Sequence, residues 1–228
     1  MRESIKTLNK EIISCKKCPR LVKWRKRIAE EKVARFSQWN YWGKPVTGFG
    51  DLNARLIIIG LAPAAHGANR TGRMFTGDRS GEWLYRTLHK YGFASQPISY
   101  SKDDSLQLSD CYITAVVRCA PPENKPTTNE IRNCNPFLIR ELKLLSNSRV
   151  IVTLGRVAFD STIRIIRKLN LTNKTKFPIF RHGLVIRVND QMTIIASYHP
   201  SQQNTFTGKL TTSMFDSIFA HAAQIINE

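Results

Sequence analysis

The stretch Arg55-Leu-Ile-Ile-Ile-Gly60 decides the fold class. It is a short apolar run, rich in β-branched side chains, that stops at a glycine, and this pattern is typical of a strand buried in a parallel sheet. Similar runs predict further strands, and the stretches between them predict helices. Alternation of this kind predicts an α/β fold in which helices cover both faces of one sheet. The expected strands are 112–117, 150–154, 184–188 and 192–197; the expected helices are 21–36, 80–91, 127–145, 156–169 and 210–226, with one more before Cys15.

The loops that follow the expected strands carry the polar and glycine-rich motifs. In α/β sheets, ligands bind beyond the carboxyl ends of the parallel strands. Here those ends lead into the segments 60–81, 118–126 and 198–208. We therefore expect the three segments to converge on one crevice. The helix after the second segment should begin with a capping box, because Thr127 is followed three residues later by Glu130.

The charge of the chain indicates its class of partner. The 228 residues include 35 Lys and Arg against 17 Asp and Glu, a net charge of +18. The length suits one domain, 1–228, and the 42% of apolar residues is typical of a globular chain. So large a surplus favours a polyanion, and segment 16–35 alone holds nine basic residues and two acids. Nucleic acid is the preferred partner; ribosome-like RNA contacts and a merely solvated helix face are the alternatives.

Apolar segments long enough for a membrane are missing from the sequence. The longest run, Leu56–Ala65, is interrupted by Gly60 and Pro63 and is too short to cross a bilayer. The start, Met1–Ser4, is not followed by the apolar core of a signal peptide. We expect a cytoplasmic protein without a membrane partner.

Five cysteines form a candidate metal centre and one leftover. Cys15 and Cys18 are separated by two residues, which suits two thiolates on one centre, and Cys119 and Cys134 complete a set of four. Four thiolates suit a tetrahedral zinc or a [4Fe–4S] cluster, and spacing alone puts zinc first. Unpaired core cysteines, or disulfides, are the alternatives. Cys111 lies in an expected strand and is interpreted as a small buried hydrophobe.

Three motifs in the expected loops resemble those of a known family. The stretch 60–78, Gly-Leu-Ala-Pro-Ala-Ala-His-Gly-Ala-Asn-Arg-Thr-Gly-Arg-Met-Phe-Thr-Gly-Asp, resembles the first active-site motif of family-5 uracil-DNA glycosylases. The stretch 117–126, Val-Arg-Cys-Ala-Pro-Pro-Glu-Asn-Lys-Pro, resembles the second motif, and 199–204, His-Pro-Ser-Gln-Gln-Asn, resembles the third. The resemblance covers nearly the whole chain, in order. That family's four cluster ligands match Cys15, Cys18, Cys119 and Cys134.

The resemblance implies a fold, a cofactor and an activity. The fold would be a three-layer α/β/α sandwich with a central, mainly parallel sheet. The cofactor would be a structural [4Fe–4S] cluster, which shifts the preference from zinc to iron. The activity would be hydrolytic excision of uracil, and of hypoxanthine and related deaminated bases, from double-stranded DNA, leaving an abasic site. We expect a monomer; a sliding clamp is a candidate partner, although the sequence holds no convincing clamp-binding peptide.

The first motif supplies the expected base pocket. Phe75 is the candidate for stacking on the extruded base, as the matching residue does in this superfamily, with a plain core role as the alternative. The backbone amides of Gly60, Ala62 and Ala64 are candidates for facing the base or a phosphate, since small residues let the main chain approach closely. Related glycosylases often carry an acid or amide where this chain has Ala62, which leaves the water-activating residue undecided. A small residue there also suits a roomier pocket that accepts purines.

The remaining candidates are polar. His199 is expected to donate to a base oxygen and stabilise the leaving anion. Asp78 is a candidate for orienting water or stabilising the cationic sugar, with capping of the next helix as its alternative. Asn124 and Asn204 have amides suited to base edges, phosphate or water, or to plain turns. The candidates for a wedge into the duplex are Gln202, Gln203 and Phe206.

Three other functions compete with this one. The first is a non-enzymatic, metal-stabilised DNA-binding module, which would not turn over. The second is an RNA-binding factor with a zinc centre, which would be colourless. The third is a family-4 glycosylase specialised for uracil; Asn124 after the double proline and the alanine-rich first motif favour family 5.

Overall fold

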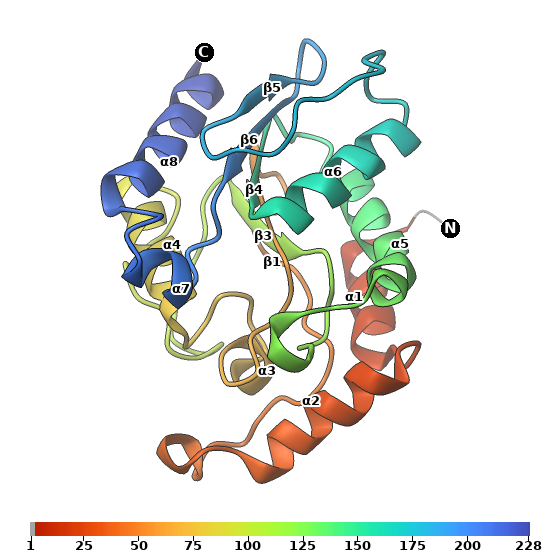
Figure 1. Cartoon of the computed structure of the whole chain (residues 1–228), viewed down its shortest axis with the longest axis vertical. Helices are drawn as coiled ribbons and strands as arrows, with labels where there is room; N and C mark the ends of the chain where they lie inside the picture. Colours follow the sequence, from red (N-terminus) through yellow and green to blue (C-terminus); the bar gives the residue numbers. More distant parts are fainter. Residues whose placement is uncertain (1–2) are drawn as a thin grey trace.

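A six-stranded sheet forms the centre of the molecule, in the order β1-β3-β2-β4-β6-β5 (Figure 1). The computed structural model describes residues 3–228; Met1 and Arg2, part of the start in which no signal segment was expected, lie outside the described residues. The four central strands are parallel, and β1 and β5 pair antiparallel at the two edges, which confirms the expected mainly parallel sheet. The strands are β1 Phe49–Gly50, β2 Leu56–Gly60, β3 Cys111–Ala115, β4 Val150–Leu154, β5 Val185–Arg187 and β6 Thr193–Ser197.

Helices cover both faces of the sheet, as expected for an α/β/α sandwich. α4 and α8 lie on one face, and α5 and α6 lie on the other (Figure 1). α1 packs on α5, and α2, which follows α1 in the chain, lies below the sheet in the view of Figure 1. The helices are α1 Ile5–Ser14, α2 Pro19–Glu31, α3 Ala68–Thr71, α4 Arg79–Lys90, α5 Thr128–Leu144, α6 Arg156–Lys168, α7 Gln202–Phe206 and α8 Thr212–Asn227, with 3-10 turns at Ala34–Phe36 (η1) and Pro122–Asn124 (η2). Within residues 3–228, none of the helices is both long and apolar enough to cross a bilayer.

The decisive stretch is the central strand β2, and all five of its residues are buried. Successive side chains of a strand point to opposite faces. Ile58 accordingly packs into the core under α4 and α8, whereas Ile57 and Ile59 pack into the core under α5 and α6. The apolar run is therefore continuous because both faces of this strand are covered.

The order of the strands places the candidate site. The chain leaves β2 toward β3 on one side, then returns to add β4 and β6 on the other side of β2. In open α/β sheets, this reversal of direction opens a crevice beyond the carboxyl ends of the strands. Gly60 and Gly155 end the two adjacent strands β2 and β4 at this edge, and His199 follows β6.

Several boundaries differ from the expected ones. The helix expected at 21–36 ends at Glu31, because Lys32 has a positive φ of 52° and leaves the helical region. The expected strand 112–117 ends at Ala115. The short elements β1, α3 and α7 were not expected, since two to five residues are too few to show a period. The capping box of α5 is confirmed in both directions, from Thr127 and from Glu130.

Candidate active site and cysteine centre

The first and third motifs meet at one point of the crevice. The rings of Phe75 and His199 are stacked, with centroids 6.0 Å apart and planes 28° apart. Gly60, at the end of β2, lies under this pair: a Cβ there would stand 2.7 Å from Cζ of Phe75. Gly155, directly after β4, is also close to the pair: a Cβ there would stand 3.4 Å from Cβ of His199. An aromatic ring and an imidazole are thus held together where β2, β4 and β6 end.

Phe75 is held in an unusual backbone conformation. Its φ is 53°, in the left-handed region that side chains other than glycine rarely adopt. Gly81 makes this course possible, since a Cβ there would come within 1.7 Å of the Phe75 carbonyl oxygen. The Tyr85 hydroxyl donates to the neighbouring Met74 carbonyl at 2.8 Å. Strain held by its surroundings in this way is typical of functional sites.

Asp78 has the capping role that was its alternative. Its Oδ1 accepts from the Gly81 amide at 2.9 Å and caps α4. The second oxygen, Oδ2, lies against Gly67, where a Cβ would stand 2.1 Å away. Burial raises the pKa of Asp78, and the amides of Gly81 and Ser80 and the Arg70 guanidinium partly oppose that rise. The carboxylate therefore joins the start of α4 to the first motif at Gly67.

His199 presents a neutral imidazole. Burial lowers the pKa of His199 to about 4, so the ring carries no charge at neutral pH. Among the described residues, no hydrogen bond reaches either of its ring nitrogens, and the side chain is partly exposed. Asn204 supports it from below, with Nδ2 donating to the His199 carbonyl at 2.8 Å. The structure thus gives Asn204 a role in positioning His199, while the imidazole keeps a donor for a ligand.

The second motif, residues 117–126, contributes less to the Phe75–His199 site than the other two motifs do. Asn124 is exposed, at the end of η2, with a φ of 58°. Among residues 3–228, no hydrogen bond joins Asn124 to Phe75 or His199. Ala62 packs against the core under α5 and α6, and the Ala64 carbonyl accepts from the Asn69 amide at 3.0 Å. The structure therefore brings together Gly60, Phe75, Asp78, His199 and Asn204, and leaves Asn124 at the surface.

Arg70, which the sequence did not single out, organises the first motif. Its Nε donates to the His66 carbonyl at 2.8 Å and its Nη2 to the Gly77 carbonyl at 3.0 Å, next to Asp78. Its guanidinium also lies 3.9 Å from the ring centroid of Phe36 and 4.1 Å from that of Trp39. The aromatic residues Phe36 and Trp39 are visible in the sequence, but the arginine that stacks on them, Arg70, is distant in the chain.

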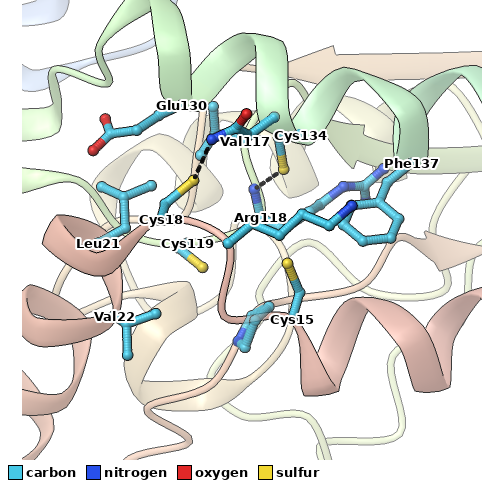
Figure 2. Close-up of a pocket in the computed structure, with 13 residues that line it drawn as sticks. Cys15, Cys18, Leu21, Val22, Val117, Arg118, Cys119, Glu130, Cys134 and Phe137 are labelled. Carbon is cyan, nitrogen blue, oxygen red and sulfur yellow. Dashed lines mark hydrogen bonds between the residues drawn. The ribbon is translucent and has the colours of Figure 1, made fainter.

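Four cysteines line one cavity between α1, α2, α5 and the loop after β3 (Figure 2). The cavity has mainly apolar walls, among them Leu21, Val117 and Phe137. Two N–H groups donate to sulfur: the Arg118 amide to Cys134 at 3.3 Å, and Asn133 Nδ2 to Cys18 at 3.7 Å. The four cysteines are Cys15, Cys18, Cys119 and Cys134, whereas Cys111 is buried in the core under α4 and α8, as the sequence predicted.

The chemistry of these four thiols indicates the kind of centre that they suit. A tetrahedral zinc with bonds of about 2.3 Å would hold its four sulfurs about 3.8 Å from one another. Within residues 3–228, no group of three or more His, Cys, Asp or Glu side chains is arranged to hold a single ion. Four thiols around one shared cavity with mainly apolar walls are a donor set that fits an inorganic centre such as an iron–sulfur cluster.

Comparison with known proteins agrees with these observations. Residues 47–223 match the model of the uracil DNA glycosylase superfamily. A type-5 uracil-DNA glycosylase of Mycobacterium leprae is 48% identical over 97% of this chain and 96% of its own length, and one of Thermus thermophilus is 47% identical over 94% of each. A type-4 uracil-DNA glycosylase of Archaeoglobus fulgidus is 28% identical over 87% of this chain and 82% of its own length. The chain therefore belongs to the uracil DNA glycosylase superfamily and, within it, to the type-5 family.

Proposed function

We propose that this protein is a monofunctional DNA glycosylase that hydrolyses the bond between the sugar and uracil, or another deaminated base such as hypoxanthine, in double-stranded DNA. The observation that carries the proposal is the stacked pair of Phe75 and His199, 6.0 Å apart, at the carboxyl edge of the sheet. The net charge of +18 suits a polyanionic partner, and its binding should weaken steeply with salt. The protein would act as a monomer on DNA inside the cell.

Base extrusion is the first step of the proposed reaction. The glycosidic bond is inaccessible in stacked DNA, so the nucleotide has to leave the helix, at a cost of a few kcal/mol that is smaller at a mismatch. Phe75 offers a flat face for the base. Gly60 leaves room for the Phe75 ring, since a Cβ at Gly60 would stand 2.7 Å from Cζ of that ring. The small Ala62 suits a pocket that also admits a purine such as hypoxanthine.

Bond cleavage then needs charge stabilisation. The electron pair of the glycosidic bond leaves with the base, which becomes an anion, while the sugar becomes cation-like. The oxygen of water then bonds to C1′, and the proton that this water releases ends on the free base, directly or through solvent. A neutral His199 donates a hydrogen bond to the base oxygen and stabilises the anion. Asp78 stabilises the cationic sugar or orients the water, and Asn124 reaches the base edge or the backbone once DNA is bound.

The cysteine cavity is proposed to hold a structural [4Fe–4S] cluster. Cys15, Cys18, Cys119 and Cys134 would be its ligands, and the donors to Cys134 and Cys18 would stabilise the thiolates. When bound, the cluster supplies a rigid cross-link rather than reaction chemistry. We infer that it joins the N-terminal CxxC segment to the sheet in one domain. The purified protein would then be brown, whereas a zinc protein would be colourless.

An excision assay tests the proposal. Duplexes with U·G and hypoxanthine·T pairs should yield alkali-labile abasic sites, and matched C·G and A·T duplexes should not. In Asp78→Asn the cap acceptor is kept and the charge is lost, so the rate should fall about 10²-fold with little change in melting temperature. A protein that binds both duplexes in a salt-dependent manner and cleaves neither is the non-enzymatic module instead.

The pH dependence of excision should reflect a histidine that is already neutral. Because the pKa of His199 is about 4 rather than the ordinary 6.5, the imidazole stays uncharged as the pH falls from 8 to 5. The single-turnover rate should therefore show no midpoint near pH 6.5 that comes from titration of His199. A titration of the His199 ring followed by NMR gives the same quantity directly, and a midpoint between pH 6 and 7 would contradict the expectation.

A further inference from the structure

We infer that Arg20 is a positioning residue that holds the second motif, and with it Asn124, against the wall of the cysteine cavity. The inference rests on the proposed function. Arg20 lies two residues after Cys18, at the start of α2, and nothing in the sequence marks it among 35 basic residues. Its contacts reach both the cavity wall and the loop that carries Asn124.

The guanidinium of Arg20 is fixed by three hydrogen bonds. Nε donates to Glu130 Oε1 at 2.8 Å, Nη2 donates to Glu130 Oε2 at 2.8 Å, and Nη2 also donates to the Lys125 carbonyl at 3.0 Å. A two-pronged Arg–carboxylate pair is geometrically specific, and a lysine cannot reproduce it. Arg20 is thereby tied to the residue directly after Asn124.

Glu130 connects the same pair to the cavity and to α5. It lines the cysteine cavity and lies four residues before Cys134 on that helix (Figure 2). Its Oε2 also accepts from the Thr127 amide at 2.7 Å, as part of the capping box. The Arg20–Glu130 pair therefore joins the start of α5, the end of the second motif and the first turn of α2.

The loop held in this way is strained. Glu123 and Asn124 have φ values of 53° and 58°, so two consecutive residues other than glycine lie in the left-handed region. Asn tolerates that region, but Glu rarely does, because its Cβ comes too close to the following carbonyl oxygen. Within the turn, the amides of Asn124 and Lys125 donate to the carbonyls of Pro121 and Pro122, and the exposed Lys125 Nζ donates to Glu123 at 3.2 Å. Strained backbone persists only where its surroundings determine it, and Arg20 is the contact that ties this turn to the rest of the protein at Lys125.

Variants of Arg20 test the inference. In Arg20→Lys and Arg20→Ala, the single-turnover excision rate should fall about 10- to 100-fold because Asn124 is misplaced, while duplex affinity stays nearly constant. Visible absorption per protein should also be retained, since all four cysteines remain. The matched control is Arg140→Ala, which removes an arginine that joins α1 to the same helix α5 through Glu11 and makes no contact with the second motif.

A double variant shows whether Arg20 acts through Asn124. If it does, Arg20→Ala combined with Asn124→Ala should be no slower than Asn124→Ala alone. Additive losses would overturn the inference, and so would an Arg20→Lys protein as fast as the wild type.

Hydrogen exchange gives a readout that needs no activity. The backbone amides of Asn124, Lys125 and Thr127 should exchange faster in both Arg20 variants than in Arg140→Ala. Unchanged exchange in that loop overturns the inference whatever the protein excises, whereas faster exchange in a protein that excises no base would leave the inference standing and reject the proposed function.

Discussion

Replacing His199 by alanine should lower the single-turnover rate of uracil excision by about 10²- to 10³-fold, as loss of one preorganised donor to a developing anion typically does. The imidazole is neutral because burial lowers the pKa of His199 to about 4, and among residues 3–228 its ring nitrogens have no protein partner. It is therefore a donor kept for a ligand. Affinity for an undamaged duplex should change little, because the charge that meets the phosphates lies elsewhere.

The controls for His199→Ala separate chemistry from packing. The ring also stacks on Phe75, so its removal could loosen that ring. His199→Asn keeps a side-chain donor and should recover part of the rate, while His89→Ala, an exposed histidine on α4, should match the wild type. If His199→Ala excises uracil at the wild-type rate, the proposed stabilisation of the leaving anion is wrong.

The sequence was a good guide to the parts of the fold set by local patterns. The apolar run of β2 and the glycines at its end predicted a buried parallel strand, and Thr127 with Glu130 predicted the start of α5. Both patterns act within a few residues, so no knowledge of the tertiary structure was needed. The end of α2 was missed because segment 32–36 contains neither glycine nor proline, and the change at Lys32 follows from its tertiary surroundings.

The sequence identified most of the residues that form the site, but it did not show which contact each of them makes. The motifs marked Phe75, Asp78, His199 and Asn204, but only the structure assigns Asn204 to the His199 carbonyl and Asp78 to the cap of α4. Arg70 stacks on Phe36 and Trp39, more than thirty residues away in the chain. Contacts of this range depend on how α2 packs beside α3, which periodicity does not reveal.

Replacing Glu141 by alanine should destabilise the protein by about 3–5 kcal/mol, the typical cost of leaving a buried charge without its partner. Glu141 is 0% exposed and Arg118 is 1% exposed, with Nη2 of the arginine 2.5 Å from Oε2. The hydroxyls of Tyr112 and Thr114 donate to the same carboxylate, so one side chain of α5 satisfies three partners on β3 and the loop after it. Urea unfolding measures the loss.

The Arg118–Glu141 pair lies next to the cysteine cavity, so Glu141→Ala should affect the cavity as well as the stability of the protein. Arg118 directly precedes Cys119, and its amide donates to Cys134 at 3.3 Å, so a displaced Arg118 would disturb two of the four thiols. Glu141→Ala should therefore also lose visible absorption as it loses stability. The control is Glu11→Ala, which removes an exposed α1 partner of Arg140, a residue of α5. This variant should lose much less stability and much less visible absorption than Glu141→Ala.

A paired replacement distinguishes a buried charge from a general packing defect. Arg118→Met combined with Glu141→Leu removes both charges and keeps apolar volume, and such a swap is often neutral relative to the intact pair. The double variant should therefore be more stable than Glu141→Ala alone, although Tyr112 and Thr114 lose their acceptor. If the two variants unfold at the same urea concentration, the unpaired Arg118 guanidinium is not the cause of the destabilisation. Glu141 would then stabilise the protein through its hydrogen bonds with the Tyr112 and Thr114 hydroxyls.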